Sequence, residues 1–330
     1  MKVDAFLLLQ SQNSCNSGDK FKFGLEYCLH AESLGYCAVW LGEHHFSDYS
    51  PLSRPLIYAA YIAANTKNIR IGTAAVLLPI HHPLIVAEEL ATLDVLSNGR
   101  LELGFSFAVE NFVTSRIGVA YGQLDNKCKE ALTIISTALR DGVVEHYGEF
   151  FKISKSNVRP HAIQKPLPPI WIVANSEDNL NYSISNGYGS LTRGIFANKG
   201  EGHNINYPHR YSQNQGRSGV QAIVYIAEDL ADKEDAMNRA REAIAFTLNL
   251  RGKPKNSSYN YELQKDYVDS VLNSHALIGT AEEVLDKILS AASFFNFNHL
   301  ICNFCFADIE PDRVFGSMSR FSKFIMPTLR

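Results

Sequence analysis

The chain has 330 residues, of which 46% are hydrophobic and 20% charged, a composition typical of a globular protein with a large core. Its formal net charge of -3 gives no electrostatic reason to expect nucleic acid or an anionic membrane as a partner. The sequence has no run of about 18 apolar residues that could cross a bilayer, and residues 1–10 lack the cleavage site of a signal peptide. The 6 cysteines are scattered, so we expect reduced thiols and a cytoplasmic location.

Strand-like and helix-like segments alternate along the chain. Short apolar runs predict buried strands at Val3–Leu9, Ala38–Leu41, Ile69–Leu78, Leu101–Phe105, Pro169–Ala174, Val220–Ala227 and His299–Phe304, with a sixth strand ending before Arg193. Apolar residues at helical spacing predict helices at Phe21–Leu34, Leu56–Ala64, Leu84–Leu96, Cys128–Leu139, Asn179–Ser185, Lys233–Leu248, Thr280–Ala292 and Val314–Ile325. About eight such units favour an α/β fold, a single (β/α)8 barrel spanning residues 1–330 as one domain.

Two regions do not fit the alternation. Glu145–Arg159 is extended around Gly148, and we interpret it as an inserted pair of strands. Asn198–Gly219 is polar and rich in glycine, so we expect no regular helix there and interpret the sixth helix of the barrel as eroded. We expect this segment to be mobile without ligand; it forms either a lid over the barrel mouth or a solvated loop with no role.

The loops that follow the C-terminal ends of barrel strands are where chemistry is expected. Glu43-His44-His45 follows the second strand, and a histidine there can move a proton near neutral pH. A glutamate beside two histidines also resembles a metal site, but adjacent side chains at a strand end point to opposite sides. We therefore expect one histidine at the mouth and one packed inside, and a purely structural role for either histidine stays open.

Two further loops have a composition suited to ligands. Small residues at Ala74 and Ala75 let a flat ligand approach the backbone, although ordinary packing also explains them. Ser176 can cap the helix that it precedes, and the free N–H groups of that helix can hold a phosphate, although capping alone is the simpler interpretation. Cys302 and Cys305 form a CxxC inside a strand-like run, so we expect them to pack rather than to act in redox chemistry.

Nine motifs occur in order along the chain: AESLGY at 31–36, WLGEHHF at 40–46, GTAAVLLP at 72–79, HP at 82–83, AEE at 87–89, LDVLSNGRLELG at 93–104, IVANS at 172–176, GTAEE at 279–283 and IMP at 325–327. This ordered set resembles the luciferase-like flavin monooxygenases, with the greatest likeness to the alkanal-oxidising bacterial luciferase subunits. This resemblance implies a two-component monooxygenase. A separate flavin reductase would supply reduced FMN, which would form a C4a-peroxide with O2 and oxidise an organic substrate.

The resemblance also assigns roles to single residues. It implies that His44 is the base, with His45 beside it, and that a non-proline cis peptide bond between Ala74 and Ala75 lies under the flavin ring. It places Val173 against that ring. Ser176 and Lys129 would bind the flavin phosphate, with Lys127 as the alternative to Lys129.

The chain departs from the family pattern at four positions near the expected flavin. Ser106 replaces a reactive thiol, Phe107 an arginine, Asn175 an acidic residue, and Arg193 stands near an expected aromatic. We still expect Ser106 and Asn175 to contact the flavin, and Phe107 and Arg193, with Phe46, to contact the substrate. Phenylalanines expected at the mouth, at 46, 105, 107 and 112, suggest an apolar substrate.

The resemblance further implies a dimer, either of identical chains or with a related chain, formed through the first helices of the barrel. Leu84, Ile85, Leu90 and Leu93 make one of these helices apolar all round, which suggests a second buried face. Two other functions remain open. The changes at Phe107 and Asn175 favour a non-catalytic flavin-binding or partner subunit, and the same barrel also serves deazaflavin-dependent oxidoreductases.

Overall fold

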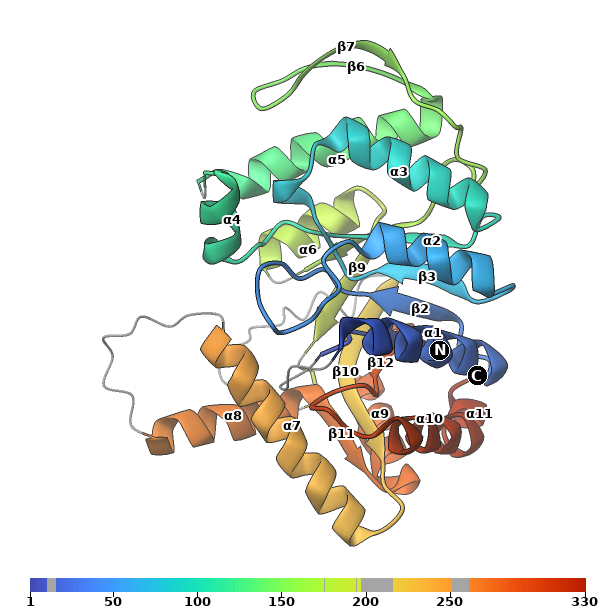
Figure 1. The fold of residues 1–330 in the computed structure, drawn as a ribbon, viewed down its shortest axis with the longest axis vertical. Coiled ribbons are helices and arrows are strands. Elements are labelled where there is room, and N and C mark those ends of the chain that lie inside the picture. The colour runs from blue at the N-terminus through green and yellow to red at the C-terminus, as the bar shows by residue number, and fades with distance from the viewer. Residues whose placement is uncertain (11–15, 121, 175, 194, 197–215, 251–260) are drawn as a thin grey trace.

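The computed structural model describes residues 1–330 except 11–15, 121, 175, 194, 197–215 and 251–260. Eight parallel strands form a closed barrel, and β1 pairs with both β2 and β12 to complete the ring (Figure 1). The barrel strands are β1 (Lys2–Leu7), β2 (Ala38–Leu41), β3 (Arg70–Thr73), β5 (Leu101–Ser106), β8 (Ile170–Val173), β9 (Gly189–Arg193), β10 (Ser218–Ile226) and β12 (His299–Asn303). The predicted (β/α)8 barrel is therefore confirmed.

Helices surround the barrel and connect its strands. They are α1 (Ser17–Ser33), α2 (Pro55–Asn65), η1 (Leu78–Ile80), α3 (Pro83–Leu96), α4 (Asn111–Ile117), α5 (Leu124–Asp141), α6 (Glu177–Ser185), α7 (Leu230–Leu250), α8 (Tyr261–His275), α9 (Ala281–Phe294), α10 (Pro311–Phe324) and α11 (Met326–Leu329). The predicted capping box is present at α9, where Thr280 and Glu283 each accept the other's backbone N–H. Gly142 ends α5 in the left-handed conformation, as expected.

Large aromatic side chains fill the inside of the barrel. Trp40 and Trp171 meet edge to face, with ring centroids 5.4 Å apart, among Phe6, Leu191 and Ile301. Below them, the fully buried Asp4 accepts hydrogen bonds from Trp40 Nε1 at 3.0 Å and His299 Nδ1 at 2.9 Å. Packing and hydrogen bonds inside the barrel thus stabilise the strands, so the loops at their C-terminal ends can carry a site without holding the barrel together.

The third predicted strand, Ile69–Leu78, is wrong as a continuous element. It consists of β3, a cis peptide bond between Ala74 and Ala75, and β4 (Val76–Leu77), after which Leu78 begins η1. Both parts pair with β5. The Thr73 side chain joins β3 to β5, because its Oγ1 donates to Gly104 O at 2.9 Å and accepts Gly104 N–H at 3.0 Å. β3 and β5 approach so closely that a Cβ at position 104 would overlap Thr73 O.

The elements that were not predicted from the sequence include α4, α8 and β11 (Ala276–Gly279) as well as the short helices η1 and α11. β11 follows α8 without a break and pairs with the C-terminal half of β10, outside the ring of eight strands. Most of Asn198–Gly219, and with it the eroded sixth helix and the lid, lies outside the described residues. Its last two residues, Ser218 and Gly219, already belong to β10.

The inserted strand pair is confirmed as a hairpin of β6 (Val143–Tyr147) and β7 (Lys152–Asn157), which lies beyond α5 at the top of Figure 1. Glu130 of α5 secures its turn. The carboxylate accepts backbone N–H groups from Glu149, Phe150 and Phe151 and the ring nitrogen of His146. The Glu130 carboxylate therefore joins the turn of the hairpin to α5, and Val144 and Ile153 pack its strands on the core.

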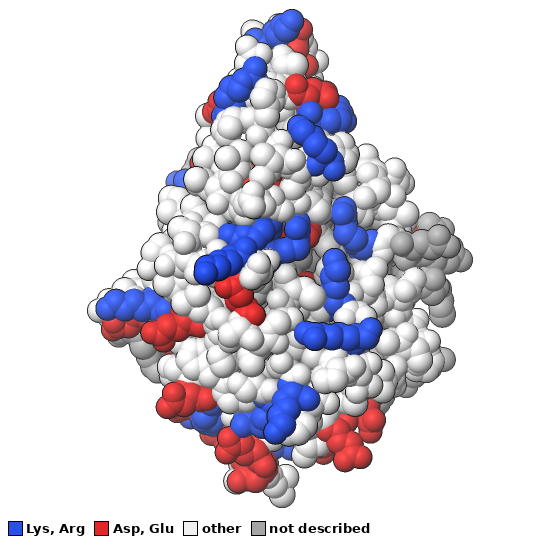
Figure 2. All heavy atoms as spheres, turned by 90° about the vertical axis from the view of Figure 1, so that its right-hand side faces the viewer, with Lys and Arg blue, Asp and Glu red and all other residues white. Residues whose placement is uncertain are grey.

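The face of the barrel at which the strands begin carries both termini (Figure 1). Figure 2 shows that this side of the molecule has charges of both signs, with several Lys and Arg side chains gathered near its centre and acidic groups close by. No helix in the described part of the chain is both long enough and apolar enough to cross a membrane. Cys302 is buried in β12 and Cys305 is partly buried, both as free thiols, which confirms that this CxxC packs in the core.

Candidate active site

A pocket opens at the C-terminal end of the barrel, beside His44. The described residues that line it are His44, His45, Ser47, Tyr49, Glu110, Phe112 and Thr247, and its empty volume is about 330 Å³, part of it open to solvent. The His44 ring meets the Tyr49 ring with centroids 4.6 Å apart at an angle of 73°. The backbone N–H of His44 also donates to Leu52 O at 3.0 Å, so both the backbone and the ring of His44 are held in place.

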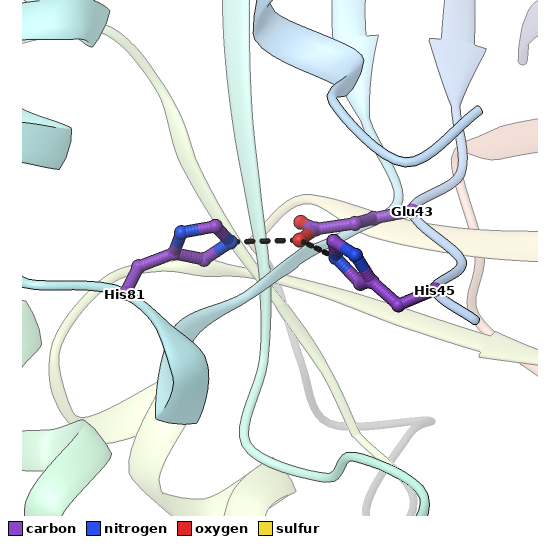
Figure 3. A group of neighbouring side chains, drawn as sticks. All are labelled: Glu43, His45 and His81. Carbon is purple, nitrogen blue, oxygen red and sulfur yellow. Dashed lines mark hydrogen bonds and ion pairs between the residues drawn. The ribbon is translucent and has the colours of Figure 1, made fainter. Parts of the chain in front are cut away.

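Glu43 lies behind this pocket with an exposed fraction of only 3%. Figure 3 shows its carboxylate between two histidine rings: Oε1 accepts His45 Nε2 and His81 Nε2, each at 2.7 Å. Its Oε2 accepts Leu77 N–H at 2.9 Å. Burial raises the pKa of Glu43, but hydrogen bonds from His45 and His81, the charge of His81 and the Leu77 N–H outweigh it and bring the pKa to about 2. Glu43 is therefore an ionised, fully bonded group.

The same three residues have the ligand types of a metal site, and their ligand atoms lie within 4.8 Å of one another. However, each 2.7 Å contact is the length of a charge-assisted hydrogen bond, in which a histidine N–H donates to the carboxylate. Arg54 Nη1 lies 3.4 Å from His81 Nδ1, which adds a cation on the side of His81 away from Glu43. The geometry favours a hydrogen-bonded cluster over a cation site.

The two histidines behave as strand alternation predicts, in that His45 turns to Glu43 while His44 turns to Tyr49. Both still line the pocket. The expected cis peptide bond between Ala74 and Ala75 is present, and Ala74 packs on the inner cluster that contains Trp40 and Trp171. Val173, at the end of β8, packs on the same cluster. The histidine pair, the alanine pair and Val173 thus belong to one end of the barrel.

Two expected phosphate ligands lie around α6. Ser176 is its N-cap, and its side-chain oxygen accepts Asn179 N–H at 3.2 Å. Lys129 Nζ lies 5.4 Å from the centroid of the Tyr182 ring, also on α6. Lys127 instead donates to Pro79 O at 3.3 Å, so Lys129 is the lysine nearer to this helix. Asn175 lies outside the described residues.

Other expected contacts are placed differently. Phe105 and Phe107 are buried in the core, and Phe107 packs against Tyr182, so neither lies at the mouth as expected. Phe46 is 54% exposed, with Arg116 over its ring at 5.9 Å. Ser106 is buried and its hydroxyl donates to Ala108 O. Arg193 is exposed at the end of β9, where its charge helps burial lower the pKa of His275 to about 4.

Sequence reasoning missed the roles of Glu43, His81 and Glu110. Glu43 was visible only as part of the EHH motif, and His81 only as a neighbour of the His82-Pro83 motif. It also missed polar atoms that are buried without a partner at the ends of strands, among them Gln10 Nε2 and Asn303 Oδ1. Asn303 is two residues beyond Ile301 of the inner cluster, so it shares the inward face of β12. Such atoms are typical of a site that receives a polar ligand.

A family model described as luciferase-like monooxygenase matches residues 1–295. The oxygenase component of the flavin-dependent trigonelline monooxygenase of Acinetobacter baylyi is 28% identical over 288 residues, covering 80% of this chain and 78% of that protein. The alkanal monooxygenase alpha chain of Photorhabdus luminescens is 24% identical over 355 residues, covering 100% of this chain and 97% of its own.

Solved structures share the fold. Monooxygenase RslO1 from Streptomyces bottropensis superposes with a TM-score of 0.85 at 21% identity and full coverage of both chains. Two further structures carry different cofactors. The oxygenating constituent of 3,6-diketocamphane monooxygenase from Pseudomonas putida, in complex with FMN, has a TM-score of 0.72 at 18% identity and covers 99% of both chains. An F420-dependent secondary alcohol dehydrogenase has a TM-score of 0.75 at 16% identity and covers 100% of this chain and 99% of its own.

The match to the luciferase-like monooxygenase model and the similarity to flavin-dependent oxygenases show an oxidoreductase of the monooxygenase class. The chain belongs to the luciferase-like monooxygenase family.

Proposed function

We propose that the chain is the oxygenase component of a two-component system that takes reduced FMN from a separate reductase and uses O2 to oxidise an organic substrate. The observation that carries this proposal is that His44, which lines the pocket, and the Ala74–Ala75 segment lie at the same end of the barrel. The similarity to an oxygenase component and to alkanal monooxygenase alpha chains supports a partner that supplies the flavin.

The residues present fit FMN. Ala74, Ala75 and Val173 offer a small apolar wall for a flat ring, and buried unpaired atoms such as Asn303 Oδ1 offer partners for its polar edge. Ser176 and Lys129 would hold the phosphate near the N-terminus of α6. Glu177 and Asp178 also lie in that first turn, so Lys129 is needed to offset their charge.

Bound reduced FMN would supply the electrons that activate O2. The chain itself would orient the substrate and exclude water. His44 is the group that we assign to proton transfer, because it lines the pocket and its ring is held by Tyr49. His45 lines the same pocket, but its Nε2 is engaged by Glu43, so it acts as a fixed neighbour of His44.

The described part of the pocket suits a substrate with polar groups rather than a bare alkyl chain. The apolar expectation depended on four phenylalanines, of which only Phe112 lines this pocket. The other six lining residues all carry hydrogen-bonding side chains. We propose an organic substrate that presents a polar group to His44 and an apolar part to Phe112.

Two alternatives have specific support. Burial of Phe107, where the family has an arginine, favours a subunit that binds flavin weakly or not at all. The shared fold with an F420-dependent enzyme favours a deazaflavin. His44 in the pocket argues against the first, and the similarity to flavin-dependent oxygenases argues against the second.

The experiment is to load the chain with reduced FMN anaerobically, mix it with oxygenated buffer and follow the visible absorption of oxidised flavin. A return that is delayed relative to free reduced FMN supports the proposal. Reduced F420 in place of FMN is the control for the deazaflavin function, and absence of any flavin binding would favour the partner-subunit function.

We also propose that the chain forms a dimer through α2 and α3. These helices pack side by side and expose Ile57, Tyr61, Ile85 and Leu96. Of the four apolar residues that suggested this face, Leu90 and Leu93 are buried against the barrel and Leu84 is partly buried, so only Ile85 is exposed. Leu96 of α3 and Ile57 and Tyr61 of α2 make up the rest of the exposed set.

A further inference from the structure

The carboxylate of Glu43 connects three segments that are separate in the sequence. His45 belongs to the loop that carries His44, and Leu77 belongs to β4, two residues after Ala75. His81 lies between η1 and the start of α3. All three donate to the same side chain, so its position fixes the spacing between these segments.

The chemistry of this contact requires an ionised carboxylate. Two N–H groups share Oε1 and a third meets Oε2, so both oxygens must accept, and an amide in this place would set its NH2 group against at least one of the three donors. A buried carboxylate is unfavourable unless it is hydrogen-bonded, and here the three donors compensate. The bonds to Oε1 also require both histidines to carry a proton on Nε2, which leaves Nδ1 of His81 facing Arg54.

The connected segments carry two parts of the proposed site, His44 and the Ala74–Ala75 peptide. His44 lies between Glu43 and His45, so two side-chain contacts hold the chain on both sides of it. The Ala74–Ala75 peptide lies directly before β4, which Glu43 holds at Leu77. A change at Glu43 would therefore move His44 and the alanine pair relative to each other.

We propose that Glu43, together with His81, is a positioning pair that sets the separation between the His44 ring and the Ala74–Ala75 segment. This inference rests on the proposed function, since it concerns how His44 is presented to a flavin and substrate. Neither residue contacts the reacting atoms in this proposal; they act through His44.

The chain provides a matched control in Glu32. This carboxylate also accepts three N–H groups, from Lys67, Asn68 and Ile69, at 2.9, 2.6 and 2.9 Å. Those donors precede β3, at the end of the barrel remote from the pocket. All three bonds end on Oε1 of Glu32, which the amide oxygen of glutamine can replace, so Glu32→Gln is the same substitution at a carboxylate that also accepts three N–H groups but does not adjoin His44.

The test uses Glu43→Gln, His81→Leu, His81→Gln and Glu32→Gln in the full chain. Histidine-ring NMR would report the tautomers of His45 and His81 and the environment of His44. Mixing of the FMNH2-loaded protein with oxygen would report the delay in flavin oxidation. We expect Glu43→Gln and His81→Leu to shift the His44 signals and to shorten the delay about tenfold, because misplaced groups in a site lose rate steeply.

His81→Gln keeps a donor where His81 Nε2 stands, so we expect it to restore His44 signals and a delay within about twofold of the parent chain. Glu32→Gln should leave both readouts unchanged, because its donors lie at the end of the barrel remote from the pocket. The proposal is overturned if Glu43→Gln behaves like Glu32→Gln, or if His81→Gln is no better than His81→Leu. Should Glu43→Gln fail to fold, the two His81 variants decide alone.

Failure of the proposed function is distinguishable from failure of this inference. If the parent chain shows no delay with FMNH2, the proposed function fails, while the NMR signals of His44 still test the positioning role. If the parent chain shows the delay and Glu43→Gln keeps it with unchanged NMR signals, the positioning role fails and the proposed function stands.

Discussion

The rings of His44 and Tyr49 lie 4.6 Å apart and nearly perpendicular, so Tyr49 holds His44 at the edge of the pocket without blocking it. His44 contributes little to the core, and its removal should spare the fold. We predict that His44→Ala keeps its circular dichroism spectrum and flavin binding but loses product formation by about 100-fold or more, as expected for a lost proton-transfer group.

Tyr49→Phe is the control for this variant, because it keeps the ring that holds His44. It should retain most of the activity. Normal product yield from a well-folded His44→Ala protein would remove His44 from the mechanism.

The exposed apolar face of α2 and α3 predicts a dimer that a single charge disrupts. Ile57, on α2, is 73% exposed and is the most exposed of the four apolar residues of this face. We expect Ile57→Glu to give a monomer by light scattering at micromolar concentration, because a charge would be buried in an apolar interface. Leu289→Glu, at an exposed position on α9, should leave the mass unchanged. A parent chain that is already monomeric would contradict the interface.

Glu130 should control the stability of the β6–β7 hairpin. Glu130→Gln leaves at least one of its four donors without an acceptor, which we expect to cost about 1–3 kcal/mol locally. Amide hydrogen exchange at Phe150 and Phe151 should accelerate, while exchange in the barrel strands stays unchanged. Glu145→Gln, an exposed position on the same hairpin, should have no effect; equal acceleration in both variants would dismiss the role of Glu130.

His275 predicts a loss of stability in mild acid. Burial and the charge of Arg193 lower its pKa from 6.5 to about 4, so the folded state holds the neutral ring. Its contribution is fully present above pH 6.5 and is lost as the pH falls towards 4, because the unfolded chain binds the proton first. We expect a loss on the order of 2 kcal/mol in the free energy of unfolding over this range. Denaturant titrations at several pH values give the free energy of unfolding as a function of pH. The curves of the parent chain and His275→Gln should differ in slope only between pH 6.5 and 4, and parallel curves would refute the assignment.

The Glu43–His45–His81 cluster predicts indifference to divalent metals. Because every ligand atom already takes part in a hydrogen bond, we expect Zn²⁺ or a chelator to shift the melting temperature by less than about 1 °C. A rise in melting temperature that disappears in His81→Gln would show that the cluster is a metal site.

Local sequence patterns predicted the barrel well where burial of one or both faces of a helix or strand produces a clear apolar pattern. A near-continuous apolar run marked β1, a short apolar run marked β2, and the Thr280–Glu283 spacing marked the start of α9. The patterns failed where no turn residue separates two elements. β11 begins directly after His275, the last residue of α8, so nothing in the sequence marks its four residues as a separate strand. They also failed at Ala74–Ala75, where two small residues interrupt an apolar run without changing its composition.

The site was predictable only in part, for a physical reason. His44 and the alanine pair stand at strand ends, where the barrel rule directs attention. The contact between Glu43 and His81 spans 38 residues and depends on how two loops fold back, so no local pattern reports it. Leu90 and Leu93 suggested an interface because apolar residues spread around a helix have two explanations. They can form one broad surface buried against the barrel, as here, or two separate surfaces, and periodicity does not distinguish these cases.

The close approach of β5 to Thr73 at Gly104 limits how this chain can diverge. Even alanine at position 104 would push β5 away from β3, and the displacement would pass through Thr73 directly to Ala74. We therefore expect Gly104 to tolerate no other residue, whereas Ser47, on a loop, and Phe112, on α4, have side chains that build the pocket rather than the barrel. New substrate preferences can accumulate at such positions over generations while the strands beneath them stay the same.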